Sequence, residues 1–240
     1  MNSAGNEKPL SLIASAHGQD GTLRSKVQRQ LRNAILDGRY SAGQKLVERE
    51  LCELTGASRS ILREALVGLE ASGLVESESY RGYRVTLLSV RKICEIFELR
   101  ASLETQAAEL FAERASDAEM VELQSLLVDL EKSVVNADLP AMRLIKERYY
   151  ELLFSGCRNG EIRRALESII DRVHYLRGRL MSSADRRAVS LTEMKRLTAA
   201  LLARDQLAAR AACLAHLAAA RDAVLESMAK NLEVTEKAVL

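Results

Sequence analysis

The sequence has no tryptophan, and aromatic residues make up only 4% of its 240 residues. It has two prolines, so long helices would meet few interruptions. Four cysteines are spread along the chain without a CxxC pair or a secretory signal, which argues against a disulfide framework and predicts reduced thiols in a cytoplasmic protein. No apolar run approaches the roughly 20 residues of a membrane span, so we expect a soluble protein without a membrane partner.

Sequence motifs of the common enzyme classes are also missing. The chain has no G-x-S-x-G, no Walker P-loop, no G-x-G-x-x-G after a strand and no paired Cys/His cluster. The E-x-x-H pairs of a di-metal helical-bundle enzyme are absent, and the three histidines are scattered. These absences predict a protein that is not an enzyme.

The charge is unevenly distributed along the chain. Residues 22–86 contain 11 Lys and Arg against 8 Asp and Glu, an excess of three, whereas residues 87–240 contain 23 of each. The positive excess therefore lies in the smaller N-terminal block, as a modest nucleic-acid-binding surface would require. Hydrophobic residues make up 48% of the chain, which is enough for one or two cores, and Ala, Leu, Arg and Glu favour helix.

The chain divides into an N-terminal arm and two larger parts. Residues 1–21 contain Gly, Ser and Asn without sustained periodicity, which predicts a flexible arm. In residues 22–86, apolar periodicity predicts helices over 22–37, 47–55 and 58–72, with residues 39–46 as a loop. Two β-type pieces, LVES and YRVT, follow and predict a hairpin with Gly82 in its bend.

Three short helices followed by a two-stranded ribbon are typical of the winged helix-turn-helix. In that arrangement the third helix enters the major groove of DNA. Ser58, Arg59 and Ser60 lie at the amino end of this helix, with Arg63 one turn later. An arginine there can donate two hydrogen bonds to guanine, and serine hydroxyls suit phosphate oxygens. The pattern therefore predicts a sequence-specific partner, double-stranded DNA.

The segment GQKLVERELCELTGASRSILREALVGLEASGLVESESYRGYRV, residues 43–85, resembles the DNA-binding signature of GntR-family transcriptional regulators. The match covers about 65 residues densely. The family's usual proline is replaced by Ile61, which an early helical turn tolerates, and the matching positions around it are Ser58, Arg59, Ser60, Arg63, Glu64, Ala65 and Leu66. The resemblance implies DNA contacts from Arg49, Ser58, Arg59, Ser60, Arg63, Arg81 and Gly82.

Residues 87–91 are expected to form a linker, and residues 92–235 an antiparallel bundle of six or seven helices, one of them continuous over 158–181. The segments EIFELRASLETQAAELFAE and ALLARDQLAARAACLAHLAAA resemble the first and last helices of the FCD ligand-binding domain of the FadR subfamily. The resemblance implies an effector that is a small organic acid, often held through a divalent metal. The family's metal ligands are an Asp and a His four residues apart, plus one His on each of the last two helices.

This chain departs from that metal-binding pattern. The Asp position is Lys146, its His partner is Tyr150, and the penultimate helix has Met194, so that His216 alone remains. We therefore expect no metal and no other cofactor. In its place, Lys146 would supply positive charge, Tyr150 a neutral donor, and Arg100 a group for the ligand's carboxylate. The predicted effector-binding residues are Arg100, Lys146, Tyr150, Met194 and His216.

Three of these residues also have a structural alternative. Arg100 would pair only with Glu104, or Lys146 would point to solvent beside acidic neighbours. His216 lies on an Ala/Leu face and would then be a core histidine with both nitrogens bonded.

The sequence as a whole predicts a mainly α protein with an N-terminal winged helix-turn-helix, a small β-hairpin wing and a C-terminal all-α bundle. The predicted function is a homodimeric transcriptional regulator, a repressor rather than an activator, that binds a palindromic operator and is released by an organic acid. Two alternatives stay open. One is a metal-dependent FCD regulator, and the other is a helical metabolite-binding protein that does not bind DNA.

Overall fold

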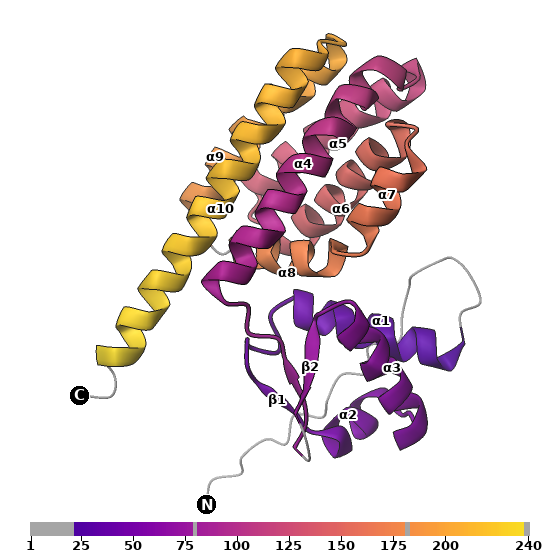
Figure 1. The fold of residues 1–240 in the computed structure, drawn as a ribbon, viewed down its shortest axis with the longest axis vertical. Helices are drawn as coiled ribbons and strands as arrows, with labels where there is room; N and C mark the ends of the chain where they lie inside the picture. Colours follow the sequence, from indigo (N-terminus) through magenta and orange to yellow (C-terminus); the bar gives the residue numbers. More distant parts are fainter. Residues whose placement is uncertain (1–21, 79–80, 181–182, 238–240) are drawn as a thin grey trace, which may run out of the picture.

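The structure, a computed structural model, describes residues 22–78, 81–180 and 183–237, so the arm predicted for residues 1–21 lies outside the described residues. Within these ranges, three helices and three short strands form an N-terminal part, and seven helices form a C-terminal bundle (Figure 1). The prediction of a mainly helical chain with an N-terminal winged helix-turn-helix is confirmed.

The N-terminal part is built around helix α3 (Arg59–Ala71), which is preceded by α1 (Leu23–Leu36) and α2 (Glu48–Thr55). One face of α3 is fully buried, and α1 packs on it through its own apolar stripe. Ser58 caps α3, because its Oγ accepts from the backbone N–H of Ile61 at 3.4 Å. Gly56 ends α2 in the left-handed region at φ 67°, where glycine has no steric penalty. The buried residues of α3 are Leu62, Ala65, Leu66 and Leu69.

The wing is a three-stranded antiparallel sheet rather than the hairpin expected from the sequence. Strands β1 (Lys45–Leu46), β2 (Val75–Glu78) and β3 (Gly82–Val85) have the order β1-β3-β2, and Glu76 lies opposite Arg84. Residues 45–46 were therefore wrongly assigned to a loop. A two-residue strand is too short to show alternation, and only its pairing with β3, far along the chain, defines it.

The bundle begins with α4 (Val90–Arg114), whose first turn is capped by Ser89. Val90 and Arg91, predicted to belong to a linker, are therefore helical. The segment 158–181, predicted to be one helix, forms two helices, because the helix is interrupted at Ser168 and Ile169. The helices that follow α4 are α5 (Asp117–Val135), α6 (Leu139–Gly156), α7 (Gly160–Glu167), α8 (Ile170–Leu180), α9 (Ala184–Leu202) and α10 (Gln206–Lys237).

Helices α4 and α10 lie side by side along the length of the bundle, and α10 continues past its lower end (Figure 1). Helix α5 packs on α6 and α9, which completes a core of mostly aliphatic side chains. None of the helices in the described part of the chain is long and apolar enough to span a membrane.

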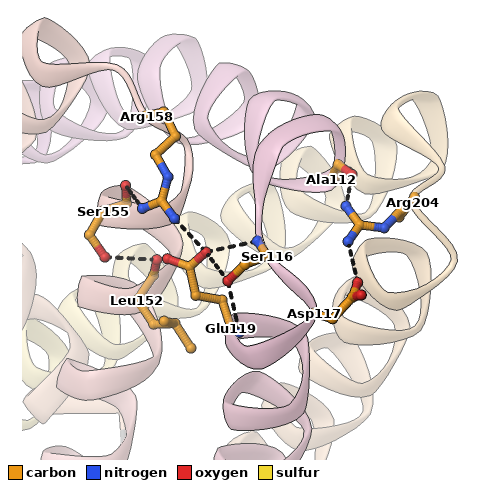
Figure 2. A network of polar contacts seen from close by, with 8 residues as sticks. All are labelled: Ala112, Ser116, Asp117, Glu119, Leu152, Ser155, Arg158 and Arg204. Atoms are coloured by element: carbon orange, nitrogen blue, oxygen red, sulfur yellow. Dashed lines mark hydrogen bonds and ion pairs between the residues drawn. The ribbon is translucent and has the colours of Figure 1, made fainter.

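A polar network joins helix ends at the far end of the bundle (Figure 2). Ser116 and Glu119 form a capping box at the start of α5, and the Arg158 Nη2 donates to Glu119 Oε2 at 2.7 Å. Arg204 donates to Asp117 Oδ1 at 2.9 Å and to a backbone carbonyl of α4. Arg158 and Arg204 both have φ of 55° directly after a helix. These positions, where glycine is usual, thus carry side chains that tie α6 and α9 to α5.

The N-terminal part contacts the bundle through α1 and α8, which lies at the end of the bundle nearest to it (Figure 1). Arg32 of α1 donates from Nε to Asp171 Oδ1 at 2.5 Å, and its Nη2 lies 3.0 Å from His174 Nδ1. A second ion pair joins Arg143 Nε of α6 to Asp37 Oδ1 at 3.0 Å. Charged groups of α1, α6 and α8 therefore contribute to the contact between these two parts.

We predict that Gly156→Ala will destabilise the bundle. A Cβ at Gly156, the last residue of α6, would lie 2.5 Å from Cε2 of the buried Phe111. Overpacking of this kind costs about 1–3 kcal/mol in the free energy of unfolding, measured by urea denaturation. Gly160→Ala is the matched control, since its Cβ would have nothing within 4 Å. Equal stability of the two variants would contradict the packing argument.

Candidate functional site

The amino end of α3 presents a polar surface to solvent. Ser58, Arg59, Ser60 and Arg63 are all exposed, while the opposite side of the helix is fixed in the core. Because buried leucines on the same helix hold it in place, these polar side chains are attached to a rigid backbone. Arg49, on the exposed side of α2, has its Nε only 3.9 Å from Glu53 Oε1, and both side chains are more than two-thirds exposed.

A hollow of about 500 Å³ lies in front of this surface. It is lined by Arg59, Ser60 and Arg63 and also by Arg24, from the first turn of α1. Arg24 was missed at the sequence level. Arg24 could have been predicted from its position three residues before the buried Val27, because this spacing places Arg24 on the side of α1 that faces α3. We call this feature the α3 hollow; Glu64 and Val67 complete its lining.

Arg63 is held by a neighbouring carboxylate. Its Nε lies 3.1 Å from both oxygens of Glu48 on α2, and the hydrogen bond and charge of Glu48 raise the pKa of Arg63. The guanidinium side chain is still 65% exposed. The hydrogen bonds to Glu48 use Nε and neither of the two terminal nitrogens of Arg63.

The wing presents one exposed arginine and one arginine that is neutralised. Arg81 is exposed at the bend, where its backbone N–H bonds to Glu78 O at 2.9 Å, and Gly82 follows with φ of 86°. Arg84, by contrast, contacts Glu76 at 2.5 Å and Glu78 at 2.8 Å on the neighbouring strand. Of the basic side chains of this ribbon, Arg81 is therefore the better placed to meet another molecule.

The predicted effector-binding residues come together inside the bundle. Arg100 is 1% exposed and donates from Nε to Glu104 Oε1 at 2.6 Å, while its guanidinium stacks 4.7 Å above the Phe97 ring. Burial lowers the pKa of Arg100, but the charge and hydrogen bond of Glu104 outweigh it and leave the pKa raised. The pairing with Glu104 that the sequence left open is thus present, although Arg100 Nη1 is buried without a hydrogen-bond partner among the described residues.

Tyr150 and His216 are hydrogen-bonded to each other. The Tyr150 hydroxyl lies 2.9 Å from His216 Nε2, and His216 Nδ1 lies 2.7 Å from Glu193 Oε2. Because the Glu193 carboxylate can only accept, Nδ1 carries the proton and Nε2 accepts from Tyr150. Burial, with the charges of Lys146 and Arg100, lowers the pKa of His216 against the opposing effect of Glu193. His216 is therefore neutral near pH 7.

Lys146 points into the protein rather than to solvent. It is 7% exposed, and its Nζ donates to Ser190 Oγ on α9 at 2.8 Å. Met194, one turn after Ser190, is completely buried. The alternative in which Lys146 lies at the surface beside acidic neighbours is therefore wrong.

Glu193 connects this cluster to a further arginine that the sequence did not single out. Arg186 donates to its two oxygens at 2.8 and 2.9 Å. Burial raises the pKa of Glu193, but the hydrogen bonds of His216 and Arg186 outweigh it and lower the pKa to about 2. We call the whole arrangement the buried polar cluster; its members are Arg100, Glu104, Lys146, Tyr150, Arg186, Ser190, Glu193 and His216.

No group of three or more His, Cys, Asp or Glu side chains within the described ranges is arranged to hold a metal ion. In the buried polar cluster, both nitrogens of His216 are already engaged, and its neighbours include the Lys146 ammonium.

Two family models match the chain: bacterial regulatory proteins, gntR family, over residues 23–85, and the FCD domain over residues 95–219. The HTH-type transcriptional regulator YdhC of Bacillus subtilis (strain 168) is 30% identical over 189 residues, 78% of this chain and 84% of YdhC. The HTH-type transcriptional repressor GlaR of Escherichia coli (strain K12) is 28% identical over 212 residues, 85% of this chain and 96% of GlaR. The solved structure of E. coli McbR/YncC has a TM-score of 0.71 at 22% identity, covering 92% of this chain and all of that one, which shows a shared fold.

We predict that Glu193→Gln will lower stability at pH 7 but much less at pH 3. The pKa of this carboxyl is about 2 in the folded state against 4.5 for an ordinary glutamate side chain, so its ionised form stabilises the fold above pH 4.5. That contribution is lost as the pH falls toward 2. Urea unfolding should show the gap between wild type and variant shrinking by about 2 kcal/mol between pH 7 and pH 3. Glu131→Gln, in a half-exposed pair with Lys195, should show little effect at either pH.

Proposed function

The chain belongs to the gntR family of bacterial regulatory proteins and carries an FCD domain, and from this premise we propose that it is a dimeric repressor released from its operator by a small organic acid. Its family and its relatives are transcriptional regulators, not enzymes. The proposal concerns the DNA site, the dimer, the effector and the absence of metal.

The α3 hollow carries the DNA-binding part of the proposal. Arg59 and Arg63 extend from the first turns of a rigid, exposed helix, at the position from which a recognition helix contacts base edges. Ser58, Ser60 and the first backbone amides of α3 suit phosphate oxygens. Arg24 adds a second cationic wall to the hollow, and Arg49, Arg81 and Gly82 would contact the flanking backbone.

The symmetry of operators supports the dimer part of the proposal. Two recognition helices related by a two-fold axis match a palindromic operator when they are about 34–36 Å apart, one turn of DNA. A single winged helix-turn-helix would contact only one half-site. The alternative of a helical metabolite-binding protein that has lost DNA binding predicts no protection of any operator, even at low salt.

We predict that Arg59→Ala and Arg63→Ala will each weaken specific operator binding by about 1–3 kcal/mol, because each removes one potential bidentate contact to a guanine. Both side chains are exposed, so thermal unfolding should stay as in wild type. Arg29→Ala, an exposed arginine on α1, serves as the control and should lower affinity far less. Affinity should be measured by fluorescence anisotropy against specific and scrambled DNA. Wild-type affinity in both α3 variants would mean that another surface binds the operator.

The buried polar cluster carries the effector part. Among its described members, three side chains are permanently cationic and two are carboxylates, and Arg100 Nη1 is buried without a hydrogen-bond partner. A carboxylate ligand would accept from that nitrogen, and Lys146, Tyr150, His216 and the apolar Met194 lie around it. Charge-assisted bonds of this kind are the strong ones in a poorly hydrated interior.

We propose further that this cluster holds no divalent metal and that the protein needs no other cofactor. The family's Asp and His positions hold Lys146, Tyr150 and Met194 here. An ammonium group repels a divalent ion, and His216 has its two nitrogens bound to Tyr150 and Glu193. Such a donor set does not fit the three or four protein ligands that zinc or a similar ion takes.

We predict that Lys146→Met will weaken effector binding by about 2–3 kcal/mol while leaving DNA binding without effector unchanged. The probe is whichever small mono- or dicarboxylate most raises the melting temperature of the wild-type protein. Operator release at increasing carboxylate concentration is then compared among wild type, Lys146→Met and Lys195→Met, whose lysine is half-exposed. Methionine keeps the length of the side chain and deletes its charge. Release of Lys146→Met at the wild-type concentration would contradict the assignment.

A further inference from the structure

A cleft of about 350 Å³ lies outside the buried polar cluster, between α6, α7 and α8. Its apolar lining comes from Leu144, Tyr150, Phe154 and Ile170, and its polar lining includes Glu147 and His174. The Tyr150 and Phe154 rings are 5.8 Å apart and tilted by 41°. We call this feature the α6–α8 cleft. Its volume lies within the range of small-molecule sites, at the lower end.

Carboxylates outnumber cations around the cleft. Its lining contains Glu147, Glu151 and Glu167 but only Arg148 and Arg163 as permanent cations. Both arginines are already bound by carboxylates: Arg148 contacts Glu151 at 3.0 Å as well as Glu122, and Arg163 contacts Glu167 at 2.8 Å. An anion would therefore meet guanidinium groups that already bind carboxylates, and it would be repelled by the larger number of carboxylates in the lining. A cation would be attracted by those carboxylates.

One carboxylate oxygen is placed to bind such a cation. Glu147 Oε1 receives both of that side chain's contacts, from Arg143 Nη1 at 2.9 Å and His174 Nδ1 at 3.0 Å. Neither of these two contacts involves Oε2. Burial raises the pKa of Glu147, but His174, Arg143 and Arg32 together lower it to about 2, so that the group is ionised at neutral pH.

The same residues connect the cleft to the N-terminal part of the chain. His174 Nδ1 lies 3.0 Å from Glu147 Oε1 and also 3.0 Å from Arg32 Nη2, and Arg32 in turn holds Asp171. One ring nitrogen cannot donate to the carboxylate and accept from the guanidinium at once. Any change in the partners of Glu147 therefore alters which of these two contacts His174 makes.

We propose that the α6–α8 cleft binds a small organic cation with an apolar body, such as an arylalkyl amine. The ammonium group binds Glu147 Oε2, and the hydrocarbon part lies over Phe154, Tyr150 and Leu144, where aromatic contact adds to apolar burial. Occupancy then shifts His174 between Glu147 and Arg32 and so changes the contact between the bundle and the DNA-binding part. This second step rests on the proposed DNA-binding function, but the binding step does not.

Calorimetric titration of the full chain tests the binding step with two molecules of matched shape, phenethylamine and phenylacetate. The amine should bind with a Kd at least about tenfold lower than that of the acid. Leu144→Arg, at a 56% exposed position of the lining, should weaken amine binding at least about tenfold, because the new guanidinium binds the carboxylates and fills the cleft. Leu144→Met should keep it.

The control is Val128→Arg, at a 47% exposed position on α5, which should bind the amine as wild type does. Equal affinity for acid and amine, or undiminished amine binding by Leu144→Arg, would overturn the site. So would an equal loss in Val128→Arg, since the added charge rather than the cleft would then be responsible.

Operator affinity with and without saturating phenethylamine tests the second step. Wild type should change by about fivefold or more, and Arg32→Ala, which lies outside the cleft, should bind the amine but show no such change. An unchanged wild type would overturn the coupling, and so would an equal change in Arg32→Ala. If the protein bound no operator at all, the proposed function would fail while calorimetry still decided the site.

Discussion

A charge buried inside a helical bundle must find an opposite charge or several hydrogen bonds, because burial without them costs several kcal/mol. The arrangement of α4, α6, α9 and α10 meets this requirement in two ways. Arg100 is satisfied within its own helix by Glu104, four residues on. His216 of α10 is satisfied only when α10 places it on Glu193 of α9, the carboxylate that Arg186, seven residues earlier on α9, also contacts. The second solution fixes how the helices face one another, and the candidate effector site is a consequence of it.

Elements defined by local periodicity were predictable from the sequence. The stripe of Leu62, Ala65, Leu66 and Leu69 fixed both the position of α3 and the face on which Arg59 and Arg63 are exposed. The start of the predicted helix over 58–72 is also correct, because the Ser58 side chain accepts from a backbone amide three residues later. Such signals are contained in a single turn of chain, so that no tertiary information is needed.

Features that depend on pairing between distant segments were not predictable in this way. Strand β1 exists because Lys45 and Leu46 pair with β3, and Arg24 matters because α1 packs beside α3. Nothing near Glu193 in the sequence indicates that Arg186, two turns earlier, and His216, on another helix, would share it. Tyr150 and His216 were brought together at the sequence level only through the family resemblance, not through spacing.

Helix α6 contributes to both proposed ligand sites and to the contact between the two parts of the chain. Lys146 and Tyr150 lie on its inner side, within the buried polar cluster. Glu147, one residue after Lys146, contacts His174 of α8, and Arg143, one turn before Glu147, contacts Asp37 at the end of α1. Since adjacent helix positions differ by about 100° around the axis, a small rotation of α6 moves both sets together. An effector favours operator release only to the extent that it binds one arrangement more tightly than the other. In the proposed mechanism, therefore, the free energy available for release is the difference in ligand-binding free energy, through Lys146 and Arg100, before and after α6 shifts. The ion pairs of Arg143 and Arg32 determine how much of that free-energy difference reaches the DNA-binding part.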